Sequence, residues 1–325
     1  MDIPKIACDA AAVAGRRKPW TQPRKQQSVN NYLLQLPHEL ILCINDFLEP
    51  PDLVLFTQTC YAMRIILEKH LERTNLNFSE RLQFLVAFAR EQPEKWVCKK
   101  CVTLHPIRKR DTPSAFVQES SCTRMREYGR RRYDTRLLSG QIRVEHRHIQ
   151  LALKYTRLQD ERYNRYLGAL LAPYHDRNFH DVLKTFYSAY PKVVMAYNGD
   201  FTYLLLSTWR YYGTYRQRRG SFDDFGSLQI CPHITVDHGR VVEVRAEGGE
   251  FMGACDHCAT DFSIEPTSDS QCLDVRVWQD FGPEGSPIDL AWQSHRYWHR
   301  PNNQSRKPGT IRKLYEEDEK CGSRG

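Results

Sequence analysis

The spacing of apolar residues changes once along the chain, and this change constrains the fold more than any other feature. In residues 33–90 and 145–190, apolar side chains recur three or four positions apart, as on a helix. After Pro191 they alternate with polar residues, as on strands, and Asn198-Gly199 predicts a two-residue hairpin turn. The expected strands cover residues 193–197, 201–212, 228–236, 240–245, 251–254, 261–264 and 274–278. The sequence therefore predicts an α+β fold, with helices first and an antiparallel sheet after them.

Length and composition indicate a globular chain. Its 325 residues suggest about two domains, and 41% hydrophobic with 26% charged residues is an ordinary balance for a folded protein. No apolar run approaches the roughly 18 residues that a membrane span needs, so we expect no transmembrane segment and no membrane partner. The polar, charged ends at residues 1–30 and 299–325 are expected to be disordered tails, the first of them basic.

Cysteine usage points to metal rather than to disulfides. The chain has eleven Cys, and its short apolar patch at residues 10–15 does not resemble a secretory signal. We therefore expect a reducing compartment, cytoplasmic or nuclear or both, in which paired Cys residues bind metal. Two C-x2-C pairs occur, at Cys98/Cys101 and at Cys255/Cys258.

The second of these pairs has a partner upstream, in Cys231-Pro232-His233. On a strand, residues i and i+2 face the same side, so Cys231 and His233 would point together, toward Cys255 and Cys258 one hairpin further along. Three Cys and one His suit a closed, structural zinc site with no open position for a catalytic water. The alternative is a buried Cys beside surface histidines that bind no metal. Two further histidines could replace His233: His238 and His257.

The first pair belongs to a less complete set. His105 and Cys122 could join Cys98 and Cys101 around a second zinc ion, again as three Cys and one His. The alternative is a group of buried thiols without metal.

A longer motif occupies the N-terminal helical stretch. Leu36-Pro37-His38-Glu39-Leu40 is followed by Ile44, Phe47-Leu48, Pro50-Pro51-Asp52-Leu53, Thr59-Cys60 and Met63-Arg64. Its order and spacing resemble the F-box of fungal proteins, from Leu33 to Glu72. A less defined similarity to fungal F-box proteins extends over residues 33–298. Such proteins often have a second C-x2-C pair shortly after the one that corresponds to Cys98/Cys101. This chain has Cys122-x2-Met125 there, and Met is a poor zinc ligand.

The resemblance implies a three-helix F-box at residues 31–75, followed at 76–298 by a helical and antiparallel β domain with the Cys/His clusters. Three short helices bury too little apolar surface to be stable alone, so we expect them to pack against a partner. In the family, that partner is a Skp-type adaptor, which docks on a cullin scaffold in an SCF ubiquitin ligase. The resemblance implies an adaptor surface formed by Leu36, Pro37, Leu40, Ile44 and Leu53. The alternative is that Leu40, Ile44 and Leu53 are internal core.

The function implied by the resemblance is recognition of an unidentified substrate protein in ubiquitin-dependent protein degradation. The chain would not be an enzyme, and the sequence contains no Gly-rich phosphate loop, G-x-S-x-G elbow or H-E-x-x-H helix. An assembly role outside a ligase is one alternative.

A zinc-containing nucleic-acid-binding protein is the alternative from another class. Residues 99–147 carry thirteen Lys and Arg against five Asp and Glu, a net charge of +8 that equals the net charge of the whole chain. Such a segment could meet nucleic-acid phosphates. A solvated surface accounts for it as well, so nucleic acid is the less favoured partner.

Overall fold

The chain folds into two compact units, Met1–Phe88 and Ala89–Gly325, each with its own hydrophobic core. The computed structural model describes residues 32–71, 76–115, 121–123, 142, 144–176, 184–212, 227–267, 272–296 and 306–322. The expected basic tail at 1–30 lies outside these residues, as does much of the basic segment at 99–147. None of the helices in the described ranges combines the length and the apolar content that crossing a bilayer needs.

The first unit is helical. After a short 3-10 turn at Tyr32–Gln35 come α2 (His38–Asp46), α3 (Pro50–Thr59), α4 (Tyr61–Leu71) and α5 (Phe78–Ala89), the last of which reaches the boundary of the second unit. Pro50 and Pro51 occupy the first turn of α3, where a missing N–H leaves no hydrogen bond unmade. Among α2, α3 and α4, a buried core is formed by Ile41, Leu53, Met63 and Leu67.

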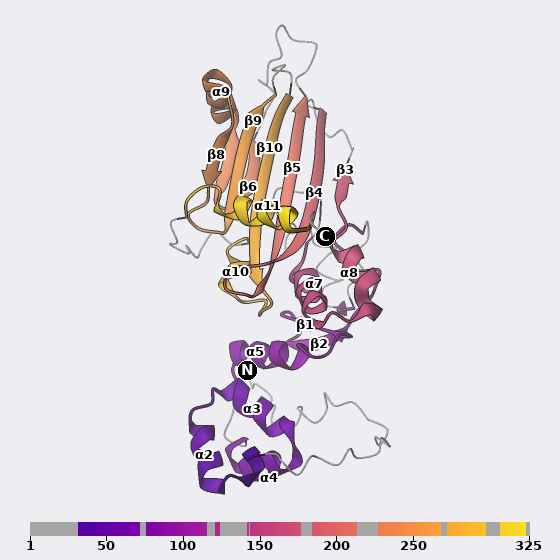
Figure 1. Cartoon of the computed structure of the whole chain (residues 1–325), viewed down its shortest axis with the longest axis vertical. Coiled ribbons are helices and arrows are strands. Elements are labelled where there is room, and N and C mark those ends of the chain that lie inside the picture. The colour runs from indigo at the N-terminus through magenta and orange to yellow at the C-terminus, as the bar shows by residue number, and fades with distance from the viewer. Residues whose placement is uncertain are drawn as a thin grey trace, which may run out of the picture. The chain divides into compact units, whose positions relative to one another are not determined.

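The second unit is built on an antiparallel sheet, which confirms the α+β prediction (Figure 1). Its six strands pair in the order β3-β4-β5-β10-β9-β8. The strands are β3 (Tyr174–Asp176), β4 (Lys184–Met195), β5 (Phe201–Tyr212), β8 (Phe251–Ala254), β9 (Thr260–Pro266) and β10 (Cys272–Pro283). Two small hairpins add β1 (Lys95–Cys98) with β2 (Thr103–Pro106), and β6 (Ser227–Cys231) with β7 (Ile234–Asp237).

Helices cover both faces of this sheet. The helical segments described in this unit are α7 (His146–Leu158), a 3-10 turn at Glu161–Tyr163, α8 (Asn164–Leu170), α9 (His238–Glu247), α10 (Leu290–Gln293) and α11 (Thr310–Gly322). Side chains alternate along a strand, so neighbours on β5 enter different cores. Tyr203 and Leu205 join the main core, to which α7 contributes, whereas Leu204 lies in a second core with Ile311 and Tyr315 of α11. Figure 1 shows α11 lying across the sheet.

The hairpin predicted around Asn198-Gly199 is confirmed as β4–β5, but its connection is longer than two residues. Ala196 N–H donates to the carbonyl of Asp200, 2.8 Å away, and Gly199 has a φ of 84°. The prediction of helix up to residue 190 is wrong, because β4 already begins at Lys184. Pro191 is tolerated inside β4 because β3 pairs only with residues 187–189, so that edge of β4 needs no N–H at Pro191.

Residues 240–245 form part of a helix, α9, rather than the predicted strand. The carboxylate of Asp237 accepts a hydrogen bond from the backbone N–H of Arg240 at 3.0 Å, which caps the helix. Val241 and Val244 then share the buried side, three positions apart. The alternating apolar pattern was therefore misleading at this point.

The prediction of a disordered tail over residues 299–325 is wrong for the part that the structure describes. α11 packs Ile311 and Tyr315 into the second core. Its first N–H groups are capped by the buried carboxylate of Asp261, which accepts from Ile311 N at 2.6 Å and from Arg312 N at 3.1 Å. Lys192 Nζ donates to the Tyr315 carbonyl at 3.1 Å.

Candidate metal centres

The first Cys/His cluster is built on the β1–β2 hairpin. Cys98 ends β1, Cys101 lies in the turn, and His105 stands on β2 directly opposite Trp96. The Val102 N–H donates to the Cys98 carbonyl at 2.8 Å, and Val102 has a φ of 52°. This left-handed backbone is strained for a β-branched residue, and such strain clusters at functional sites. The turn folds Cys101 back beside Cys98.

Helix α7 holds this hairpin and the segment before it. Lys154 is fully buried, and its Nζ donates to the carbonyls of Gln92 at 3.2 Å and Lys95 at 2.8 Å. The side-chain oxygen of Gln150 accepts from the N–H of Val97 at 2.9 Å. The strand that carries Cys98 is therefore fixed to the main core.

Cys122 reaches the cluster from a distant part of the sequence. Its neighbour Ser121 bridges to the hairpin, because Ser121 Oγ accepts from Trp96 Nε1 at 3.1 Å and donates to the Pro106 carbonyl at 2.6 Å. The Cys122 side chain is fully buried. These bonds place its sulfur over the hairpin turn.

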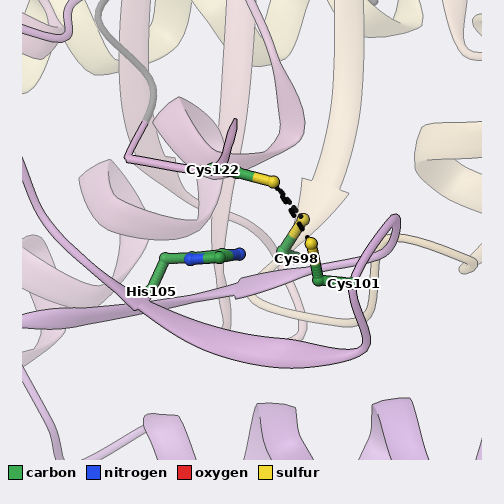
Figure 2. A group of neighbouring side chains, drawn as sticks. All are labelled: Cys98, Cys101, His105 and Cys122. Carbon is green, nitrogen blue, oxygen red and sulfur yellow. Dashed lines mark hydrogen bonds between the residues drawn. The ribbon is translucent and has the colours of Figure 1, made fainter. Parts of the chain in front are cut away.

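The geometry of the first cluster fits zinc. Figure 2 shows the imidazole of His105 pointing toward the three sulfurs, and the four ligand atoms lie within 4.8 Å of one another. Cys122 Sγ is 3.7 Å from Cys98 Sγ and 3.3 Å from Cys101 Sγ. Tetrahedral zinc, with Zn–S of about 2.3 Å, places its sulfurs about 3.8 Å apart. His105 Nε2 is buried without a hydrogen-bond partner among the described residues, a deficit that a bound cation would remove.

The electrostatics of this cluster also suit a cation. Burial, together with the neighbouring sulfurs of Cys122 and Cys101, raises the pKa of Cys98 to about 12. Burial and the charge of Lys95 lower the pKa of His105, so its ring is neutral and able to donate a lone pair. A divalent cation deprotonates coordinating thiols, which would reverse the shift at Cys98.

The second cluster joins two turns. Cys231 ends β6, His233 lies in the turn before β7, and Cys255 and Cys258 lie between β8 and β9. His233 Nδ1 is 3.9 Å from Cys231 Sγ and 3.5 Å from Cys255 Sγ, and all four ligand atoms lie within 4.8 Å of one another. The four residues therefore meet as predicted, but the reason given for Cys231 and His233 was wrong. A turn, not a shared strand face, brings them together.

Hydrogen bonds arrange the sulfurs of the second cluster. The backbone N–H of His257 donates to Cys255 Sγ at 3.4 Å, and Thr260 Oγ1 lies 3.2 Å from Cys258 Sγ. A hydrogen bond with Cys255 raises the pKa of Cys231 to about 12, and bonds from Cys231 and Cys258 hold the pKa of Cys255 well below its usual range. These hydrogen bonds favour the thiolate form of Cys255, which is the form that binds a metal.

The histidine that converges with the three cysteines of the second cluster is His233 rather than either alternative. His257 is exposed, although its ring centroid lies 5.1 Å from that of His233. His238 is the first residue of α9. Neither belongs to the group of ligand atoms that converge among the described residues.

Both clusters can therefore hold a metal ion, and their donor sets are compatible with zinc. Each offers three thiols and one imidazole, which fill the four positions of a tetrahedral ion. Such closed sites stabilise a fold and leave no open position at which the metal could activate water.

The residues expected at the adaptor surface are divided between surface and core. Leu40 is 48% exposed and Ile44 is 36% exposed, and Pro37 is exposed as well. Leu36 is half-buried and packs against the core of the helical unit, and Leu53 is 8% exposed inside that core. For Leu53, the structure agrees with the internal-core alternative.

A buried charge network near the first cluster was missed by the sequence analysis. Arg147 Nε lies 2.6 Å from Asp111 Oδ2 and Arg147 Nη2 lies 2.9 Å from Asp111 Oδ1, with side-chain exposures of only 2% and 5%. Burial alone would raise the pKa of Asp111, but hydrogen bonds from Arg147 and His148 hold it well below its usual range. No spacing rule links these residues across the sequence. Because Arg147 is committed to this pair, it does not contribute to a phosphate-binding surface.

Comparisons with protein-family models, with curated proteins and with solved structures find no match for this chain.

Proposed function

We propose that this protein is the substrate-recognition subunit of a cullin-type SCF ubiquitin ligase, with an F-box at residues 31–75 that binds a Skp-type adaptor. The proposal rests on the motif from Leu36 to Arg64 and on the surface of α2. Leu40 and Ile44 lie on one face of α2, four positions apart, and Phe47, the residue directly after this helix, is 89% exposed. Neighbouring apolar side chains exposed on one face are typical of an interaction surface.

Further exposed apolar residues lie on α4. Tyr61 is 77% exposed and Ile65 is 54% exposed, and they are four positions apart. Among the side chains of α2, α3 and α4 that the structure describes, four apolar ones form the buried core of these helices: Ile41, Leu53, Met63 and Leu67. A helical unit of this kind gains stability by covering its outer apolar side chains with a partner, which supports adaptor binding.

In this proposal the second unit holds the substrate, and both Cys/His clusters contain structural zinc. No residue of the chain performs chemistry. The ligase instead gains rate by keeping a substrate lysine near the charged ubiquitin-conjugating enzyme, and such proximity contributes several kcal/mol to lowering a barrier. Closed metal sites suit this role, because they brace a binding surface without creating a reactive centre.

The test is co-purification of the full chain with a Skp-type adaptor. The wild-type chain should retain the adaptor, and the double variant Leu40→Asp/Phe47→Asp should lower retention at least tenfold, because both side chains are exposed and would place charge in the interface. Met195→Asp is the matched control, since Met195 is 61% exposed in the other unit. Circular dichroism shows whether each variant keeps its helix content. A wild-type chain that retains no adaptor would rule out the proposal.

A further inference from the structure

The first cluster contains a pair of sulfurs that is placed for bond formation. Cys101 Sγ and Cys122 Sγ are 3.3 Å apart, which is closer than the 3.7 Å between Cys98 Sγ and Cys122 Sγ (Figure 2). A disulfide needs a separation of about 2.05 Å, so the two sulfurs have to approach by about 1.2 Å.

The three cysteines differ in access and in backbone constraint. Cys98 and Cys122 are 1% and 0% exposed, whereas Cys101 is half-buried. Cys98 is also held in the β1–β2 ladder opposite Thr103, while Cys101 lies in the turn outside that ladder. A small reagent from solvent therefore meets Cys101 first, and Cys101 can move toward Cys122 without breaking a strand pair.

We propose that Cys101 and Cys122 form a reversible disulfide when the cluster holds no metal, with hydrogen peroxide as the oxidant. The Cys101 sulfur attacks one peroxide oxygen, the O–O bond breaks, and one water leaves with Cys101 as a sulfenic acid. The Cys122 sulfur then attacks the Cys101 sulfur, and the hydroxyl group leaves as a second water. Two thiols thereby lose two electrons and two protons to one peroxide. A bound metal takes one lone pair of each sulfur, which lowers the nucleophilicity of both sulfurs and slows the first step.

The second cluster lacks this arrangement and serves as an internal comparison. Its cysteines are all buried, at 2% for Cys231, 2% for Cys255 and 4% for Cys258. Cys255 accepts a backbone N–H bond and Cys258 lies beside the Thr260 hydroxyl. Without a half-exposed cysteine, this cluster should react with peroxide more slowly. The inference does not depend on the proposed ligase role.

The test uses the full chain, freed of metal by a chelator under reducing conditions and then of reductant. One equivalent of hydrogen peroxide is added, remaining thiols are alkylated, and tryptic peptides are mapped by mass spectrometry. Trypsin cleaves after Lys99 and Lys100, so linkages through Cys98 and Cys101 are distinguished. We expect a Cys101–Cys122 linkage to form first, to be reversed by dithiothreitol, and to form at least tenfold more slowly after zinc is restored.

Two variants sharpen the test. Cys98→Ser should keep the linkage. Cys98→Ser/Cys122→Ser should abolish it and leave Cys101 as a sulfenic acid, which a second equivalent of peroxide converts to sulfinic acid because no other thiol of the cluster remains to trap it. Dominant linkage through Cys98, equal oxidation of the second cluster, or no protection by zinc would each overturn the inference. The wild-type peptide map decides the matter even if a variant fails to fold.

Discussion

Replacing Asp111 by alanine tests the contribution of the buried charge pair beside the first cluster. The substitution leaves the Arg147 guanidinium at 2% side-chain exposure without its bidentate partner. Removing one member of a buried pair costs about 3–5 kcal/mol, because the remaining charge is desolvated. The Glu145 carboxylate, which also contacts the Arg147 guanidinium, compensates part of that charge and favours the lower end of this range. For a unit of this size, roughly 2–4 °C is lost per kcal/mol, so we expect the melting temperature to fall by roughly 6–20 °C.

Tryptophan fluorescence is the suitable assay for this prediction. The tryptophans that the structure describes all lie in the second unit, which contains the pair: Trp96, Trp209, Trp278 and Trp292. Urea unfolding followed by the fluorescence of these residues gives the free energy of unfolding. Thermal unfolding followed in the same way gives the change in melting temperature.

Two comparisons decide whether burial is the cause of that loss. Glu243→Ala breaks the exposed pair with Arg240, whose side chains are 49% and 61% exposed, and should cost at most about 0.5 kcal/mol. The double variant Asp111→Ala/Arg147→Met removes both buried charges and should recover much of the lost stability. If Asp111→Ala is no more harmful than Glu243→Ala, the argument from desolvation is refuted.

Three further predictions concern individual residues of the second unit. Burial lowers the pKa of His295 from 6.5 to about 4, so the unfolded chain binds the additional proton between these values and stability falls as the pH drops through this range. In urea unfolding, the free energy of unfolding should fall by up to about 1.4 kcal/mol for each pH unit of acidification in this range. This fall should be smaller in His295→Phe. Val102→Gly should raise the free energy of unfolding by about 1 kcal/mol in thermal denaturation, because glycine adopts a positive φ without strain, and a loss of stability would contradict this. Ser121→Ala should weaken zinc binding about 10–100-fold in a competition titration, because it frees the segment that carries Cys122, whereas Thr123→Ala should bind as wild type does.

The fold class could be predicted because long stretches of the chain each repeat one hydrophobic period, helical in residues 33–90 and from residue 145, and strand-like after Pro191. The hairpin at Asn198-Gly199 and the strands β8, β9 and β10 lie where alternation predicts them. The members of both Cys/His clusters could be predicted because C-x2-C spacing is local and metal chemistry restricts the remaining partners.

The errors have separate physical causes. The β-branched residues Val241, Val242 and Val244 favour a strand, and the decisive signal was the Asp237 cap one residue before α9. Pro191 was interpreted as a helix boundary, although an unpaired strand edge also tolerates proline. In α11 the charged residues outnumber the apolar ones, and the packed face is indicated by Ile311, Leu314 and Tyr315 alone.

The Asp111–Arg147 pair could not be predicted, because the two residues are far apart in the sequence and an Arg in a basic stretch gives no sign of burial.

The position of α11 has a practical consequence for anyone who shortens this protein. Cutting at residue 298, where the sequence suggests that order ends, would leave Val194, Leu204 and Trp278 facing water instead of Ile311 and Tyr315. A sheet surface stripped of its cover favours self-association and low yields. Purification tags therefore belong at the amino terminus, and a shortened chain should keep every residue of α11, through Gly322.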